Sequence, residues 1–352
     1  MTINQQKLDT LVGSLLGELS AGYGGVMVSL GDKLGLYRAM AGGGPLSSHE
    51  IARRSRCSER YVREWLNSQV AGGYVAYHPA SATYELTPEQ AAVLADDTSP
   101  VFLPHAWQVV ASMWADEAKT LNAFKSGEGV SWGEHSDRLF CGVAAFYRNY
   151  YSASLVQEWL PTLSGVTDKL EKGAKVADIG CGHGHSTVLM AKAYPESSFW
   201  GFDVHEGSIE IARRVAQEAG VEERVSFEVA NADEYVGRDY DLICFFDCLH
   251  DMGRPVDAMH HARTAMARDG AIMLIEPYAG NRVEDNISPI GRLYYAASTT
   301  LCCAHAISEK GTHVLGAQAG PSRLEAVLKS AGFETIRQAT RTPFNLIIEA
   351  RL

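Results

Sequence analysis

Positive charge is scarce in this sequence, and the shortage limits what the protein can bind. Acidic residues outnumber basic ones by 42 to 31, and the formal net charge is -11. Tight non-specific binding of nucleic acid needs a positive surface that releases condensed counterions. General electrostatic attraction to DNA is therefore not expected.

Cysteines are also few. There are seven, an odd number without regular spacing, which is not the pattern of a disulfide framework. Residues 1–7 lack the charged-then-apolar order of a signal peptide. No uninterrupted run approaches the length of about 18 apolar residues that a membrane span needs. These absences predict a cytoplasmic protein with reduced thiols and no membrane contact.

The chain is long enough for more than one core. It has 352 residues, of which 46% are hydrophobic and 21% charged, an ordinary globular composition that fits two domains. We place a helical domain at 1–95, a helical linker or lid that lines the pocket at 96–160, and the larger domain at 161–352.

A glycine-rich turn is the most informative segment. A short buried strand is expected at 176–179, followed by Gly180, Gly182 and Gly184 and then a helix. Glycines at alternate positions allow a tight turn and a close ligand, towards which the helix N–H groups point. The spacing differs from the G-x-G-x-x-G of dinucleotide sites, and Asp178 puts a carboxylate on the strand. Such a site suits an ammonium or sulfonium group better than a pyrophosphate.

This segment resembles the first motif of the class I S-adenosylmethionine-dependent methyltransferases, an acidic strand residue followed by G-x-G-x-G. The resemblance extends over residues 150–352. It implies a Rossmann-like α/β fold with a seven-stranded, mostly parallel, doubly wound sheet. It also implies S-adenosyl-L-methionine as the methyl donor, S-adenosyl-L-homocysteine as the product, and contacts of Asp178 and the three glycines with the cofactor.

Further polar residues follow the next expected strands, at the sheet edge where such folds bind ligands. Asp203 lies 203 − 178 = 25 residues after Asp178, and a carboxylate there can accept hydrogen bonds from both ribose hydroxyls. An acid at a strand end can also be purely structural. The resemblance implies these additional cofactor contacts: Val204 beside Asp203, Ala232 and Asp233 at the adenine, and Asp247 at the methionine end.

The candidate catalytic residue is His250. Methyl transfer is a direct displacement that needs alignment and exclusion of water, and a general base is needed only when the acceptor is a hydroxyl. The segment 249–252, Leu-His-Asp-Met, resembles a His-Asp pair of several O-methyltransferases. Alternatively, His250 merely closes the loop. The resemblance implies a small, apolar or aromatic acceptor, methylated at O, N or S.

The N-terminal part reads as a winged helix. Helices are expected at 1–20 and 25–40, then a capping box at Ser47-x-x-Glu50, a second helix after Ser58, and two short strands. In the O-methyltransferases that the sequence resembles, this module caps the catalytic domain and builds a homodimer. The alternative is a DNA reader that uses arginines of the second helix. Acids between those arginines favour the dimer.

Two other segments lie near the expected pocket. Tyr147 and Tyr150, in an aromatic run before the cofactor domain, are predicted to line the site, because ring faces attract a sulfonium and phenols bind a carboxylate; ordinary core packing is the alternative. The insertion at 277–320 contains Cys302-Cys303-x-His305. We expect no metal there, because no second ligand pair has metal spacing and adjacent cysteines rarely share an ion. Residues 311–320 form either a mobile lid or a plain loop.

Three functions fit these observations. A methyltransferase is the favoured hypothesis. A winged-helix transcriptional regulator that senses the cofactor is the alternative, and a dinucleotide-dependent oxidoreductase is disfavoured by Asp178 and the glycine spacing.

Overall fold

The computed structural model describes residues 2–352. The chain divides into two compact units. The first contains the residues up to Ala111 and Cys141–Asn149, and the second contains Ser112–Phe140 and Tyr150–Leu352. The segment 96–160 is therefore shared between both units, and the long helix α8 (Asp137–Ser154) contributes residues to each.

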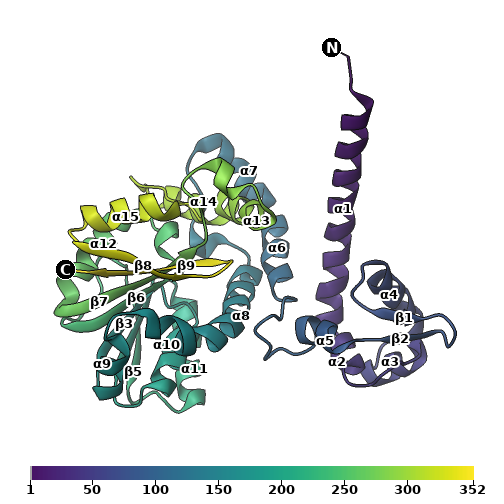
Figure 1. The fold of residues 1–352 in the computed structure, drawn as a ribbon, viewed down its shortest axis with the longest axis horizontal. Coiled ribbons are helices and arrows are strands. Elements are labelled where there is room, and N and C mark those ends of the chain that lie inside the picture. The colour runs from purple at the N-terminus through teal and green to yellow at the C-terminus, as the bar shows by residue number, and fades with distance from the viewer. Residues whose placement is uncertain (1) are drawn as a thin grey trace. The chain divides into compact units, whose positions relative to one another are not determined.

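The first unit has the predicted winged-helix order. Its elements are α1 (Gln5–Lys33), α2 (Leu36–Met40), α3 (Ser48–Ser55), α4 (Glu59–Ala71), β1 (Ala76–His78), β2 (Thr83–Glu85) and α5 (Pro88–Leu94) (Figure 1). The capping box exists: Ser47 Oγ accepts from the Glu50 N–H, and the Glu50 carboxylate accepts from the Ser47 N–H. Val62, Trp65 and Leu66 form the buried face of α4, whereas Tyr61 is 82% exposed.

Helix α1 corrects the expectation of two N-terminal helices. It runs unbroken through Gly25, where a Cβ would lie 2.1 Å from the Trp107 ring, and through Gly31, where a Cβ would lie 2.5 Å from the Trp65 ring. These glycines allow close packing within the helix and do not end it. The chain turns only at Gly35, whose φ of 67° is left-handed.

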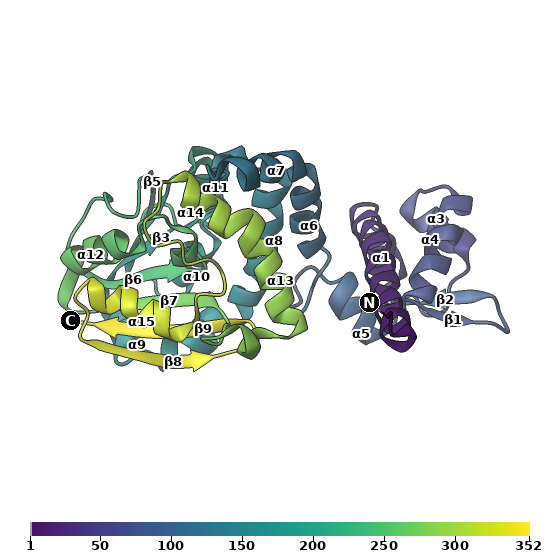
Figure 2. The same cartoon turned by 90° about the horizontal axis from the view of Figure 1, so that it is seen from above.

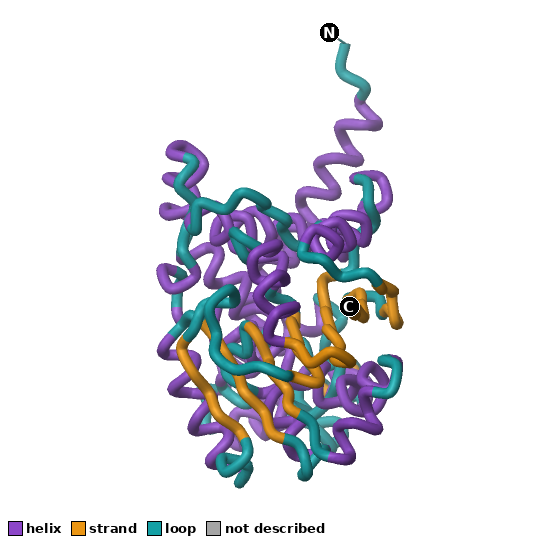
Figure 3. The backbone as a smooth tube through the Cα atoms, turned by 90° about the vertical axis from the view of Figure 1, so that its left-hand side faces the viewer, coloured by secondary structure: helices purple, strands orange, loops and turns teal. Residues whose placement is uncertain are grey.

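The outer part of α1 exposes an apolar face. Figure 3 shows its N-terminal half extending away from the rest of its unit. In residues 2–352, α1 is the one helix long and apolar enough to cross a membrane, with a best-window mean hydropathy of 1.3 and 11% of that window buried. The sequence has no uninterrupted apolar run of that length, and α1 passes only on its average over an interrupted window. The absence of membrane contact stays a prediction. The exposed side chains are Leu8, Leu11, Val12, Leu15, Leu16, Leu19, Tyr23 and Val26.

The second unit contains the predicted doubly wound sheet. Its strands lie in the order β5-β4-β3-β6-β7-β9-β8, with β9 antiparallel to both neighbours and the other pairs parallel. The expectation of a seven-stranded, mostly parallel sheet is confirmed. The strands are β3 (Lys175–Ile179), β4 (Ser198–Asp203), β5 (Val225–Val229), β6 (Tyr240–Phe246), β7 (Met266–Pro277), β8 (Thr335–Arg341) and β9 (Asn345–Arg351).

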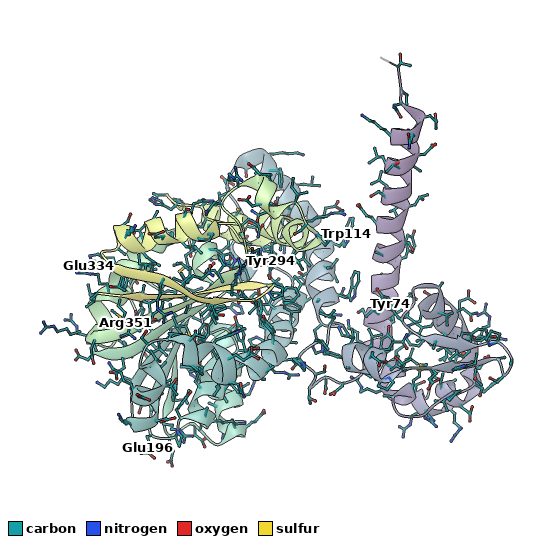
Figure 4. The ribbon with its side chains drawn as sticks, in the orientation of Figure 1. Tyr74, Trp114, Glu196, Tyr294, Glu334 and Arg351 are labelled. Carbon is teal, nitrogen blue, oxygen red and sulfur yellow. The ribbon has the colours of Figure 1, made fainter. Side chains whose placement is uncertain are left out.

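Helices cover both faces of this sheet, as Figure 1 shows. Buried side chains of β3, β6 and β7 pack against α12 and α15 on one face, in a core that includes Ile243, Met259 and Leu328. Glu334 and Arg351, labelled in Figure 4, mark the neighbouring ends of β8 and β9. The helices are α9 (Val166–Lys172), α10 (His185–Ala193), α11 (Glu206–Ala219), α12 (Pro255–Ala265) and α15 (Gly320–Ser330).

The insertion at 277–320 is mostly helical, which its sequence did not indicate. Helix α13 (Pro289–Ala297), a π-helical turn (Ser298–Cys302) and α14 (Cys303–Ser308) follow one another as one bent run (Figure 2). The turn consists of small and polar residues, so no apolar period marked it. The segment after α7 (Glu117–Ser126) attaches to this run: the Val130 N–H donates to the Ala304 carbonyl at 2.9 Å.

Candidate active site

The three glycines between β3 and α10 have different surroundings. All have positive φ, 69° at Gly180, 53° at Gly182 and 72° at Gly184. A Cβ on Gly180 would lie 2.9 Å from Cys248, and one on Gly184 would lie 2.5 Å from the Phe227 ring. A Cβ on Gly182 would meet no described atom within 4 Å. Packing therefore requires glycine at 180 and 184, and only Gly182 of the three has open space where a Cβ would lie. The cofactor contacts of all three stay predictions.

Asp178 connects the strand to the helix. Its Oδ2 accepts hydrogen bonds from Ser186 Oγ at 2.7 Å and from Thr187 Oγ1 at 2.6 Å. Its Oδ1 is buried without a hydrogen-bond partner among residues 2–352. Burial raises the pKa of Asp178 to about 6, although the two hydroxyls oppose the shift. Asp178 thus links the end of β3 to the first turn of α10 through these two hydroxyls. Its direct contact with a cofactor stays a prediction.

The raised pKa of Asp178 gives folding stability a defined pH dependence. Its value of about 6 in the folded state lies above the ordinary 3.8, so between these pH values the folded state binds more protons than the unfolded state. Stability from this group is fully present below about pH 4 and is lost as the pH rises to about 6. The size of the loss is on the order of 2–3 kcal/mol.

Asp178→Asn cannot ionise and should lack this dependence. We expect the difference in stability between the wild type and Asp178→Asn to change across that window, measured by chemical denaturation at closely spaced pH values. Acids that do not interact with Asp178 act equally in both proteins and cancel in the difference, whereas the charge of Asp203 is one cause of the shift itself. Parallel pH curves for the two proteins would show that Asp178 is not perturbed.

Asp203 lies directly beside the open glycine. Its Oδ2 accepts from the Gly182 N–H and its Oδ1 from the His205 N–H, both at 2.9 Å. Burial raises the pKa of Asp203, and these two N–H groups oppose the shift. The neighbouring Val204 is 46% exposed. The carboxylate of Asp203, which the sequence assigned to the ribose, therefore lies next to the open space at Gly182.

The predicted adenine contacts follow β5. Asp233 Oδ2 lies 2.8 Å from Arg254 Nη2, an ion pair that the sequence did not indicate because the two residues are distant in the chain. Ala232 is partly buried against the core of the second unit. Both residues lie at the carboxyl end of the sheet, and their role stays a prediction.

Asp247, the residue after β6, has a strained backbone conformation. Its φ is 50°, a left-handed value that non-glycine residues adopt at a cost and that is frequent at functional sites. Its Oδ2 accepts from Tyr151 Oη at 2.5 Å and its Oδ1 from Asn345 Nδ2 at 2.8 Å. Burial raises the pKa of Asp247 to about 7. Sequence reasoning missed Asn345, which no local pattern marks, and did not single out Tyr151 within its aromatic run.

The two predicted tyrosines belong to different units. Tyr150 lies in the second unit, where its ring packs edge-on against Trp159 at 5.1 Å and Phe344 at 6.1 Å. Tyr294 of α13 (Figure 4) donates to the Phe344 carbonyl at 2.9 Å. Tyr147 lies in the first unit, edge-on to Phe146. Its contact with a cofactor bound in the second unit stays a prediction.

His250 is held between two carboxylates. Its Nδ1 lies 2.6 Å from Glu276 Oε2, and its Nε2 lies 3.0 Å from Asp251 Oδ1. The other Glu276 oxygen accepts from the Leu249 N–H at 3.1 Å. Burial lowers the pKa of His250, but Asp251 and Glu276 outweigh burial and raise it well above its ordinary value. The imidazole must therefore release its Nε2 proton before it can act as a base.

Sequence reasoning missed Glu276, although a signal existed. It lies at the carboxyl end of β7 (Met266–Pro277), as Asp203 lies at the end of β4, and acids at the carboxyl ends of parallel strands converge on one edge. The edge thus offers an open backbone turn with carboxylates beside it, and an imidazole–carboxylate pair. Such an arrangement can bind a ligand that carries hydroxyls and positive charge, and can move a proton.

Two family models match this chain. The model of the Rv2258c-like winged HTH domain matches residues 22–96, and a methyltransferase domain model matches residues 170–332. Curated relatives include 27-O-demethylrifamycin SV methyltransferase of Amycolatopsis mediterranei, 31% identical over 107 residues, which are 30% of this chain and 39% of the relative. A ubiquinone biosynthesis O-methyltransferase of Chelativorans sp. is 28% identical over 47% of this chain and 60% of its own length. The chain thus spans about half the length of the curated relatives it matches.

Solved structures with the same fold cover nearly the whole chain. A putative O-methyltransferase of Nostoc punctiforme has a TM-score of 0.69 and 21% identity over 99% of both chains. Human N-acetylserotonin methyltransferase, in complex with S-adenosylmethionine, has a TM-score of 0.68 and 18% identity over 97% of both chains. Residues 22–96 are therefore a winged helix-turn-helix domain and residues 170–332 a methyltransferase domain of the class I fold, the combination that the sequence predicted.

Proposed function

We propose that this protein is an S-adenosylmethionine-dependent methyltransferase that acts on a small, apolar or aromatic acceptor. The observation that carries the proposal is the free space in front of Gly182 with the Asp203 carboxylate beside it. A ribose placed there can donate its hydroxyls to a carboxylate while the adenosyl group lies against bare backbone. The cofactor supplies a methyl group already activated on a sulfonium.

In this mechanism the residues of the chain bind the cofactor and orient it. Asp203 would hold the ribose and Ala232 and Asp233 the adenine, with Val204 alongside. Asp247, fixed by Tyr151 and Asn345, would accept from the ammonium of the methionine end. These contacts would come from the carboxyl ends of the neighbouring strands β4, β5 and β6. Alignment of acceptor and methyl group then provides most of the rate, since no further activation is needed.

Asp203→Ala tests this binding mode. We expect the affinity for S-adenosylhomocysteine, measured by calorimetry, to fall by about 1.5–3 kcal/mol, the range for hydrogen bonds to a charged group. Glu218→Ala is a matched control, because this exposed acid lies in the last turn of α11, away from the carboxyl ends of the strands. Unchanged affinity in Asp203→Ala would refute the ribose assignment, and absence of binding in the wild type would refute the proposed function.

The His250–Glu276 pair favours oxygen as the methylated atom. A hydroxyl is the acceptor that must lose a proton during transfer. Glu276 holds Nδ1 at 2.6 Å and so directs Nε2 as the proton-accepting atom. A thiol or an amine acceptor would make the pair dispensable, and the effect of removing His250 decides between these cases.

We further propose that the protein is a homodimer paired through α1. Leu8 and Leu15, like Val12 and Leu19, are 15 − 8 = 7 and 19 − 12 = 7 residues apart, the repeat of paired helices, and all four are exposed. Sedimentation should find a dimer for the wild type and a monomer for Leu15→Glu. A wild-type monomer that floats with lipid vesicles would instead assign α1 to a membrane and overturn both the dimer and the cytoplasmic location.

The winged helix is proposed as a dimerisation module, not a DNA reader. Its exposed arginines on α4 are paired within the helix, Arg60 with Glu64 at 2.5 Å and Arg63 with Glu59 at 3.3 Å. Paired arginines offer less charge to phosphates. Site-specific gel shifts at physiological salt would contradict this assignment and favour the regulator.

A further inference from the structure

A thiol lies beside the imidazole of the candidate site. The side chains of His250, Asp251 and Cys302 converge so that one ligand atom of each lies within 4.8 Å of the others. They come from the 3-10 turn after β6 (Leu249–Asp251) and from the π-helical turn Ser298–Cys302. Both His250 and Cys302 are buried, and Asp251 is partly exposed.

This group differs from the Cys302-Cys303-x-His305 run considered from the sequence. Cys303 Sγ lies 3.4 Å from Ser298 Oγ, and His305 Nδ1 accepts from the Trp132 N–H at 3.2 Å. Those two side chains therefore face other partners. Only the folded chain brings Cys302 to His250, which lies in a different loop and could not be paired with it by spacing.

The geometry leaves donor atoms available. Glu276 occupies His250 Nδ1, so that Nε2 is the ring atom directed at the group. Asp251 Oδ1 is only 3.0 Å from Nε2, yet it is buried without a well-formed hydrogen bond to any described residue. The ion pair with His250 leaves this oxygen poorly aligned with the Nε2–H, so that it can accept a further partner. A cation between the three side chains would satisfy it.

We propose that His250, Asp251 and Cys302 bind a thiophilic divalent cation, with Zn²⁺ as the preferred ion. Zinc takes nitrogen, oxygen and sulfur ligands at about 2.0–2.3 Å in a tetrahedron, which puts neighbouring donors roughly 3.5 Å apart. The three ligand atoms lie within 4.8 Å of one another, so binding requires them to approach. Glu276 behind the imidazole completes a carboxylate–histidine–metal arrangement. Harder cations such as Mg²⁺ prefer all-oxygen sites.

Occupation of this site has a consequence for catalysis, which rests on the proposed function. The cation would take the Nε2 lone pair of His250, and the thiol and imidazole protons would be released to solvent. An imidazole bound in this way cannot accept a proton from an acceptor hydroxyl. Zinc should therefore inhibit the enzyme reversibly.

The binding test uses the full-length protein, purified with chelator and titrated with Co²⁺ as a spectroscopic substitute for Zn²⁺. We expect one equivalent to bind with a thiolate-to-cobalt charge-transfer band, and zinc to displace it. Cys302→Ser should lose the band and bind at least tenfold more weakly. The matched control Cys303→Ser should retain both. A wild type without the band, or a band that persists in Cys302→Ser, would overturn the site.

The second measurement follows methyl transfer with and without Zn²⁺. The wild-type rate should fall with zinc and recover with chelator, and Cys302→Ser should be at least tenfold less sensitive relative to its own metal-free rate. Binding without inhibition would overturn the catalytic consequence. If no methyl transfer is found at all, the cobalt spectra still decide the site, so that failure of the proposed function and failure of this inference are distinguishable.

Discussion

Gly182→Val is expected to abolish the binding of S-adenosylmethionine while the protein stays folded. The position has a φ of 53°, and a side chain there would project into space that no described atom occupies within 4 Å. A branched side chain would fill the space that we assign to the adenosyl group. Calorimetry and a thermal-shift assay with the cofactor measure the loss.

The control must carry the same backbone penalty. Left-handed φ costs a β-branched residue on the order of 1–3 kcal/mol wherever it occurs. Gly220 has a φ of 67° and equally open surroundings at the end of α11. Gly220→Val should therefore lose comparable stability and still bind the cofactor. Retained binding in Gly182→Val would mean that the turn is not the contact point.

The second large effect is expected for His250→Ala. If the acceptor is a hydroxyl and His250 accepts its proton, kcat should fall on the order of 10²- to 10⁴-fold. Cofactor affinity should change little, because the contacts that we propose for the cofactor do not include His250. The assay needs saturating cofactor and a panel of phenolic acceptors.

Two further variants sharpen this result. His260→Ala removes an exposed histidine of α12 and should leave kcat unchanged. Glu276→Gln keeps a hydrogen-bond partner for Nδ1 but removes its charge, and we expect an intermediate loss in kcat. A loss below about tenfold in His250→Ala would make the residue structural, and the methylated atom would then be a nitrogen or sulfur.

The sheet could be predicted because its signals are local. The strands β3, β4, β6 and β7 end at or beside a glycine or an acid. The positions of Gly182, Asp203 and Asp247 at one edge follow from parallel strand order alone. The winged helix could also be predicted from local signals. Its capping box, for example, depends only on the four consecutive residues Ser47–Glu50 and is present in the structure. Local rules sufficed wherever the determining atoms are neighbours in the chain.

What could not be predicted depends on distant contacts. The different surroundings of the three glycines could not be predicted, because Phe227 of β5 and Cys248 after β6, which pack against Gly184 and Gly180, are distant in the chain. Asn345 reaches Asp247 across 98 positions. Likewise, Gly25 looked like a break in α1 because its partner, the Trp107 ring, is far along the chain.

Helix α8 has a consequence for dissecting the molecule. Because it belongs in turn to the second, the first and again the second unit, the chain crosses between them three times around residues 111–150. A fragment that starts at residue 161 would lose Tyr151 and Trp159, whose buried rings contact each other at 5.7 Å within the catalytic half. Helix α8 therefore contributes residues to both units, and neither unit can be excised by a single cut without removing part of the other.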